Sequence, residues 1–452
     1  MCRGRGTSCR RATDRVALKT DRDQGTMELL NNLWVLLAGL LVFSMTASVG
    51  LLEVGELGRQ LDISLRKTLL ISGLSLVVMA LIGFNIAFAP TWGGWIGNPL
   101  YAPGLGLGAF SDLGTGTLGA VWWSMGPGYF ATGLTTGTYF FFETAFASVT
   151  LALVGVVLLT KVKLEAFLLY AVAYFAIIWT LPAAWIWNPS GWLARLGMVD
   201  FAGGLVVHAA AGAAGLGILA VVWSEERARG YRSSPPVVGE EQSGWLTLAL
   251  VLLWLGWFGF NPGSVLAFNS ETVVVALTTF LAAAAAMISL WALRRVVEGS
   301  DPGLRASTDG VLMGLIVITP LAGFVSPSTA LIVGAVAGPV YFLADRSFGR
   351  VRWFSDPIGL MPGHFVGGLF GILLIAFVTQ SAFAGASGYP NLVNGLLFGG
   401  GLAALRQLGV EVLGTLAVLA TVFTLSYLVM RGLSRALGGI TQDYSKVGLP
   451  PP

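Results

Sequence analysis

Two histidines limit the chemistry that this sequence can perform. They are the only histidines in 452 residues, and each lies eight positions after an aspartate: DFAGGLVVH runs from Asp200 to His208 and DPIGLMPGH from Asp356 to His364. Both lie in long apolar segments, where an ionisable side chain is costly and marks either a functional position or a well-satisfied packing position. A neutral imidazole offers one hydrogen-bond donor and one acceptor, so a facing pair could bind a small polar molecule or relay a proton.

Other classes of chemistry lack the residues that they need. The two cysteines, Cys2 and Cys9, lie at the extreme N-terminus, which leaves the rest of the chain without a thiol ligand or nucleophile. Two histidines alone fall short of the three or four protein ligands of a zinc site. We therefore expect no metal, no cofactor and no enzymatic activity. The net charge of +3 is scattered through short loops, which argues against a nucleic-acid partner.

The composition places most of the chain in a lipid bilayer. Hydrophobic residues make up 55% and charged residues 11%, against about 25% charged residues in soluble domains, and the mean hydropathy is +0.77. Eleven stretches approach the roughly 20 apolar residues that a membrane-spanning helix needs. The predicted fold class is therefore an all-α integral membrane protein with eleven transmembrane helices. The spans lie at about 33–52, 68–88, 138–160, 166–185, 200–223, 244–261, 272–293, 310–324, 328–344, 359–378 and 408–430.

Basic residues predict how these spans are oriented. Seventeen of the 26 Lys and Arg residues fall in one alternating set of connections and in the C-terminal tail, whereas the opposite set holds only Arg195 and Arg406. Cytoplasmic loops carry the excess of basic residues. The C-terminus is thus predicted to be cytoplasmic and the N-terminus external, in a cell (plasma or inner) membrane.

The spans form two halves with an inverted relation. Five spans at about 33–223 and five at about 244–378 have opposite orientations, and a final helix at 408–430 follows. This five-plus-five inverted repeat is typical of transporters. Eight residues at 1.5 Å each carry the two histidines about 12 Å inward from opposite faces, so we expect them to meet near the middle of a hydrocarbon core about 30 Å thick.

The first 26 residues contradict the charge rule, because they contain the other seven basic residues on the external side. We interpret residues 1–26 as a non-native or disordered extension before a natural start at Met27; a regulatory tail is the alternative. The membrane domain then covers 27–431, and residues 432–452 form a short cytoplasmic tail.

Glu143 and a short aromatic motif accompany the histidines. Glu143 lies in FFFETAF near one end of the third span, where its carboxylate could attract a cation or bond to a neighbouring helix. LGWFGFNPGS, from Leu255 to Ser264, closes the sixth span at the same side of the membrane, and Pro262 ends the helix there.

These motifs resemble those of the ammonium transporter (Amt/Mep/Rh) superfamily, closest to the Amt branch. The resemblance runs from about Leu33 to Met430 and rests on four motifs in order, with LLEVG at Leu51 as weaker support. The four motifs are DFAGGLVVHAAAGAAGL, LGWFGFNPGS, ITPLAGFVSPSTALIVGAVAG and GHFVGGLFG.

The resemblance implies a role for each of nine residues. His208 and His364 correspond to the twin pore histidines, and Asp200 to the carboxylate that orients the external binding region. Phe146 and Phe260 match the stacked gate. Trp187 and Ser264 fit the aromatic wall and hydroxyl that recruit ammonium, with Trp185 as an alternative to Trp187; Phe142 and Trp257 are secondary wall residues.

The implied activity is ammonium or ammonia transport by a homotrimer with one pore per subunit. A π face attracts the ammonium cation and a hydroxyl accepts its hydrogen bond, which potassium cannot donate. The family mechanism lets ammonium lose its proton before the gate and cross as ammonia, with or without a relayed proton. A membrane enzyme is the least supported alternative.

Three departures from the family pattern keep an ammonium receptor with little or no transport as the alternative. Glu143 stands where relatives usually have Gln, and Gly359, Met361 and Pro362 replace residues before His364. The tail lacks the sequence by which relatives bind PII-type regulators, which argues against that partner.

Deleting residues 1–26 tests the proposed start at Met27. We expect the shortened chain to insert into membranes and to function like the full chain, because the deleted segment contains no apolar span. Membrane fractionation and the transport assay described below provide the measurements. Loss of insertion would show that the segment belongs to the folded protein.

Overall fold

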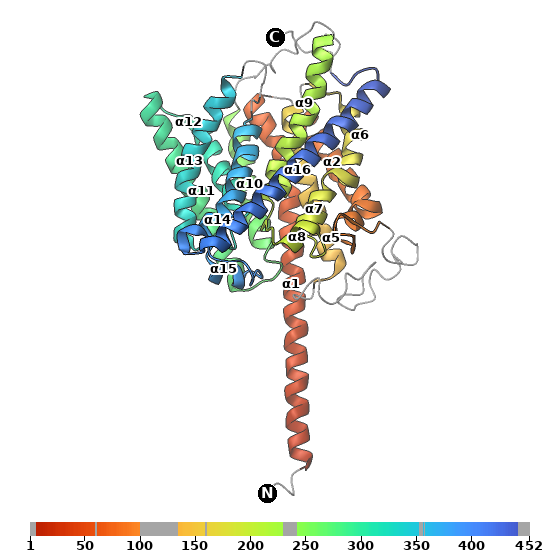
Figure 1. Cartoon of the computed structure of the whole chain (residues 1–452), viewed down its shortest axis with the longest axis vertical. Coiled ribbons are helices and arrows are strands. Elements are labelled where there is room, and N and C mark those ends of the chain that lie inside the picture. Colours follow the sequence, from red (N-terminus) through yellow and green to blue (C-terminus); the bar gives the residue numbers. More distant parts are fainter. Residues whose placement is uncertain are drawn as a thin grey trace.

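The computed structural model describes residues 6–58, 61–99, 134–158, 161–228, 242–351, 356 and 358–441. They form a bundle of long helices, from which the first part of α1 projects (Figure 1). Short elements lie between the long helices at one end of the bundle. These are the hairpin β1 (Thr91–Trp92) and β2 (Ile96–Gly97), α8 (Trp192–Leu196), α15 (Ser381–Ala386) and the 3₁₀ turn η6 (Leu396–Phe398).

The first half of the chain contributes five long helical segments, three of which contain a π-helical turn. In order they are α1 (Gly6–Leu57), then α2 (Leu61–Val78) with η1 (Met79–Gly83) and α3 (Phe84–Phe88), then α5 (Thr136–Leu158), then α6 (Leu164–Ala173) with η3 (Tyr174–Ile178) and α7 (Thr180–Ile186), and finally η4 (Gly204–Ala209) with α9 (Ala210–Ala228).

The second half contributes five more segments and a final helix. They are α10 (Ser243–Gly263), α11 (Ser270–Glu298), α12 (Gly303–Ile318), α13 (Pro327–Gly349), η5 (Leu360–Phe365) with α14 (Val366–Val378), and α16 (Gly401–Ala436). Ten of these eleven segments are long and apolar enough to span a membrane. The eleventh, α12, has only 16 residues, as expected for the short eighth stretch. The predicted all-α fold is confirmed.

Small residues let the helices approach one another closely. Gly314 of α12 and Gly334 of α13 both face α11, where an added Cβ atom would lie 2.7 Å from the Cα of Ala283 and Ala282 respectively. Such contacts hold helices together in lipid, where burying apolar surface gives little drive for association.

The ends of the chain differ from the expected boundaries. α1 begins at Gly6 instead of near residue 33, so residues 6–26 are helical and continuous with the first span. The interpretation of residues 1–26 as a non-native or disordered extension stays a prediction. α16 runs from Gly401 to Ala436, extending the expected final helix at both ends.

The residues after α16 are fixed to the helices beside them. The Glu225 carboxylate at the end of α9 accepts hydrogen bonds from the backbone N–H groups of Ile440 and Thr441 and from the Ser434 hydroxyl. The backbone N–H of Lys163 donates to the Ile440 carbonyl at 2.9 Å. The beginning of the predicted 432–452 tail is thus part of the folded body, while residues 442–452 lie outside the described residues.

Candidate functional site

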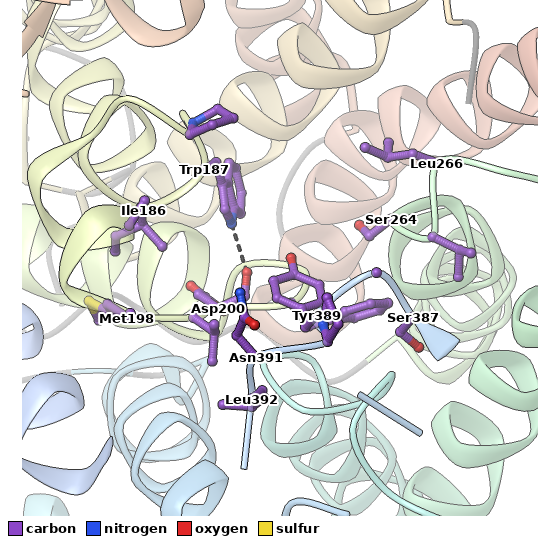
Figure 2. Close-up of a pocket in the computed structure, with 18 of the residues that line it drawn as sticks. Ile186, Trp187, Met198, Asp200, Ser264, Leu266, Ser387, Tyr389, Asn391 and Leu392 are labelled. Atoms are coloured by element: carbon purple, nitrogen blue, oxygen red, sulfur yellow. Dashed lines mark hydrogen bonds between the residues drawn. The ribbon is translucent and has the colours of Figure 1, made fainter. Parts of the chain in front are cut away.

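A cavity of about 660 Å³ opens at the end of the bundle that carries α8 and α15. We call it the large cavity. Its walls come from α5, from the chain between α7 and η4, from the end of α10 and from the loop after α15 (Figure 2). The predicted binding residues Phe142, Glu143, Phe146, Trp187, Asp200 and Ser264 all line it.

Trp187 lies in this cavity and Trp185 does not. The Trp187 indole N–H donates to the backbone carbonyl of Asp200 at 2.8 Å (Figure 2). Its ring meets Phe146 edge to face, with centroids 5.9 Å apart. Trp185 instead donates to the backbone carbonyl of Trp95 at 2.7 Å, away from the cavity. The geometry therefore favours Trp187 as the aromatic wall.

Ser264 lies just beyond the last turn of α10, opposite Trp187 across the cavity (Figure 2). Its hydroxyl donates to the Phe260 carbonyl at 2.9 Å. This bond directs the hydroxyl proton into the helix and leaves the oxygen lone pairs as acceptors. Ser264 can thus accept a hydrogen bond from a donor bound in the cavity.

Glu143 presents a buried carboxylate to the same cavity. Its side chain is 5% exposed, and its Oε2 atom has no hydrogen-bond partner among the described residues. Tyr139, one helical turn earlier, lines the same cavity. A buried carboxylate oxygen without a donor is costly, so the position is suited to a bound cation or to a proton.

Two phenylalanines close the inner end of the large cavity. The rings of Phe146 and Phe260 lie 4.3 Å apart at 41°, and Phe142 packs against Phe146 at 4.8 Å. Phe146 and Phe260 are 1% and 0% exposed. These rings form an apolar barrier where the resemblance places the gate.

The two histidines meet directly behind this barrier. The Nδ1 atoms of His208 and His364 are 3.1 Å apart, as expected from their symmetric spacing. The His208 ring stacks on Phe260 at 5.7 Å and on Trp257 at 5.6 Å. A space of about 10 Å³ adjoins both imidazoles; we call it the histidine cavity. It holds about one water-sized molecule, and the His208 Nε2 atom has no partner among the described residues.

Each histidine sits on a π-helical turn whose first N–H groups bind an aspartate. Asp200 accepts hydrogen bonds from Gly203, Gly204, Leu205 and Val206 at 2.7–3.0 Å. Asp356 accepts from Leu360 and Met361 at 3.0 and 2.6 Å. Both aspartates therefore cap the turns that carry the imidazoles.

Glycine is required immediately before each π turn. Gly203 has φ = 110° and Gly359 has φ = 76°, a left-handed conformation that L side chains adopt only with strain. The expectation of a straight helix from each aspartate to its histidine is therefore wrong in detail. The chain instead bends at the glycine and then enters a π turn.

The path continues beyond the histidines toward the other end of the bundle. A space of about 20 Å³, which we call the far cavity, is lined by His364, Leu312, Asp309 and Tyr341. Leu312 and His364 also line the histidine cavity. The large cavity, the aromatic barrier, the histidine cavity and the far cavity thus follow one another in series.

Two tyrosines of the large cavity were not identified from the sequence. Tyr139 and Tyr389 both line it, and Tyr389 lies between Asp200 and Ser264 in Figure 2. Apolar surroundings raise the pKa of Tyr389 to about 12, and Asp200 and Glu143 add to the shift. Its hydroxyl therefore stays protonated at neutral pH. Tyr389 belongs to a loop that carries no recognisable motif. Tyr139 could have been identified from the sequence, because its i, i+4 spacing from Glu143 places both side chains on one face of a helix.

The described residues include no group of three or more His, Cys, Asp or Glu side chains that could hold a metal ion. The site combines a cavity lined by two acidic residues, Glu143 and Asp200, and several hydroxyl groups with an aromatic barrier and a buried imidazole pair. Together with the helical bundle, these features are those of a membrane transport protein.

Comparison with known proteins gives the family. The model of the Ammonium Transporter Family matches residues 33–450, and the chain belongs to this family, whose named members are transport proteins and not enzymes. The ammonium transporter of Bacillus subtilis (strain 168) is 33% identical over 314 residues, 69% of this chain and 71% of that protein. Ammonium transporter Amt1 of Archaeoglobus fulgidus is 28% identical over 425 residues, 93% of this chain and 96% of that protein.

Solved structures share the fold. A protein described as Sensor Amt Protein aligns with a TM-score of 0.76 at 24% identity, covering 93% of this chain and 96% of that one. The delta442 mutant of Mep2 from Candida albicans aligns with a TM-score of 0.77 at 22% identity, covering 92% and 94% of the two chains.

The capping role of Asp200 can be tested by stability. Asp200→Ala removes the acceptor of four buried N–H groups, so we expect a loss on the order of 3 kcal/mol or more and a clear fall in Tm in detergent. Asp200→Asn keeps one acceptor oxygen and should have a Tm between those of Asp200→Ala and the unmodified chain. Glu298→Ala, at an exposed position of α11, is the control. A Tm for Asp200→Ala equal to that of the control would contradict the capping role.

Proposed function

We propose that the protein recruits ammonium in the large cavity and passes ammonia, with or without a relayed proton, between His208 and His364. The observation that carries this proposal is the 3.1 Å contact between the two imidazoles directly behind the Phe146–Phe260 barrier. A polar pair buried between apolar walls is suited to a small molecule that both donates and accepts hydrogen bonds.

The large cavity supplies what a dehydrating ammonium ion needs. The π face of Trp187 attracts a cation, the Ser264 oxygen accepts a hydrogen bond, and Glu143 provides negative charge beside Phe146 and Asp200. Phe142 and Trp257 complete the apolar wall before and after the gate.

The narrow part of the pore favours the neutral molecule. The histidine cavity has room for about one water-sized molecule and is bounded by Phe260, Trp257 and leucine side chains. An ion stripped of water pays a large solvation cost in such surroundings. Release of the proton before the barrier avoids this cost, and the imidazoles then hydrogen-bond ammonia or return the proton.

We place the large cavity outside the cell and the far cavity at the cytoplasm. The distribution of basic residues supports this orientation, with the N-terminus external and the C-terminus cytoplasmic. We further propose a membrane domain at 27–431 followed by the tail at 432–452, in a homotrimer in the cell membrane with one pore per subunit, without regulation by a PII-type protein.

An ammonium receptor is the second candidate function. The closed Phe146–Phe260 barrier and the buried carboxylate of Glu143 in the cavity wall support ligand binding without passage. In this case ammonium would bind at Trp187, Ser264 and Glu143 while the pore stays closed.

Transport is tested by the current that an ammonium pulse evokes in proteoliposomes. We expect a saturable current that potassium does not inhibit, lowered about tenfold or more in His208→Ala and His364→Ala, because each variant leaves one imidazole without its partner. Unchanged flux and current in both variants would contradict a role of the histidines. If no current flows, a pH-sensitive dye inside the vesicles separates neutral ammonia flux from binding alone, and a silent dye beside measurable binding supports the receptor.

Glu143→Gln tests the contribution of the carboxylate to ammonium recruitment. The substitution keeps the side-chain volume and removes negative charge from the cavity wall. We expect the half-saturating ammonium concentration to rise about fivefold, which corresponds to about 1 kcal/mol. Glu271→Gln, at the same end of the bundle but outside the cavity wall, is the matched control. Equal affinity of Glu143→Gln and the unmodified chain would remove Glu143 from the site.

A further inference from the structure

The far cavity contains a carboxylate that the function proposed above does not use. Asp309 of α12 lines this cavity together with Tyr341 of α13 and His364. Asp309 is 4% exposed and Tyr341 3% exposed. The cavity measures about 20 Å³, enough for one or two water-sized molecules.

Asp309 and Glu143 occupy corresponding places in the two halves of the chain. Glu143 lies near the start of the third span and Asp309 near the start of the eighth, which is the third span of the second half. Three residues after each carboxylate comes a side chain at a narrow point of the pore, Phe146 after Glu143 and Leu312 after Asp309. Because the halves are inverted, the two carboxylates lie at opposite mouths.

A tyrosine accompanies each of the two carboxylates. Tyr139 and Glu143 both line the large cavity, and Tyr341 and Asp309 both line the far cavity. Each mouth of the pore thus carries a tyrosine and a carboxylate directly before its narrow point.

Asp309 shares its ion-pair partner with a second carboxylate. Arg294 lies 3.3 Å from Asp309 and 3.0 Å from Asp345, so two carboxylates share one guanidinium group. Of these two carboxylates, Asp309 lines the far cavity.

We propose that Asp309 and Tyr341 form a second ammonium site at the cytoplasmic mouth, the counterpart of the site at Glu143. The proposal rests on the function proposed above. The Asp309 carboxylate accepts hydrogen bonds from the ion, and the Tyr341 hydroxyl, which lines the same cavity, offers a further acceptor oxygen. Ammonium that re-forms beyond His364, or that approaches from the cytoplasm, binds here before it leaves or enters the pore.

The site predicts an affinity that depends on the side of the membrane. In proteoliposomes of defined orientation, ammonium is applied to one face and the initial flux is measured. Asp309→Asn should raise the half-saturating concentration at the cytoplasmic face about fivefold or more and leave the value at the external face unchanged. Tyr341→Phe should shift the same value in the same direction by less.

Asp345→Asn is the matched control, because Asp345 shares Arg294 with Asp309 but is not among the residues that line the far cavity. Equal shifts in Asp309→Asn and Asp345→Asn, or equal shifts at both faces, would overturn the proposal. If Asp309→Asn does not insert, Tyr341→Phe decides: a shift confined to the cytoplasmic face supports the site, and no shift overturns it.

Equilibrium binding separates this proposal from the proposed transport. Ammonium chloride is titrated into the detergent-solubilised protein in a calorimeter, with potassium chloride as reference. We expect two sites, one weakened by Glu143→Gln and the other by Asp309→Asn. If both binding sites are found but no flux is measured, the transport proposal is refuted and the second site stands. If flux is measured but only one binding site is found, and only Glu143→Gln removes it, transport stands and the second site is refuted.

Discussion

The hydrogen bonds between the Asp200 carboxylate and four consecutive backbone N–H groups are the constraint on which the rest of the site depends. A helix that begins inside a membrane protein has N–H groups that water cannot reach, and each must find an acceptor. Asp200 satisfies four at once and thereby fixes where η4 begins. The direction of the His208 side chain follows from that start. The carbonyl of the same residue accepts the Trp187 indole N–H, so one aspartate sets the geometry of both the cavity wall and the first imidazole.

The contact between the two halves is possible because small residues line it. A Cβ at Gly204 would lie 2.7 Å from Pro320 Cβ, and one at Gly368 would lie 2.9 Å from the backbone nitrogen of Ala209. At Gly212 an added Cβ would lie 2.6 Å from Phe365 Cβ. Larger side chains at these places would push η4 and α9 away from η5 and α14. The 3.1 Å approach of the imidazoles therefore depends on the absence of side chains at these three glycines.

The sequence predicts the helices well because long apolar stretches with charged connections have few alternatives in lipid. The histidine pair could be predicted for a related reason, since equal spacing from Asp200 and Asp356 in inverted halves brings both to the same depth. The π turns could not, because their residues are as apolar as those of an α-helix. Gly203 and Gly359, with positive φ, precede η4 and η5, but η1 and η3 follow residues in the right-handed helical region. Tyr389 was missed because its loop reaches the cavity by tertiary folding, and α1 begins earlier than expected because its first 21 helical residues are polar yet helix-compatible.

The aromatic barrier described above also has an electrical consequence. Phe146 and Phe260 are almost completely buried, and the spaces beyond them measure about 10 and 20 Å³, so no continuous column of water crosses the part of the chain that the structure describes. A membrane potential is worth about 2.3 kcal/mol per elementary charge for each 100 mV, and an open column of water would let protons and alkali cations dissipate it. A barrier of this kind therefore separates charge across the membrane even where the protein itself crosses it.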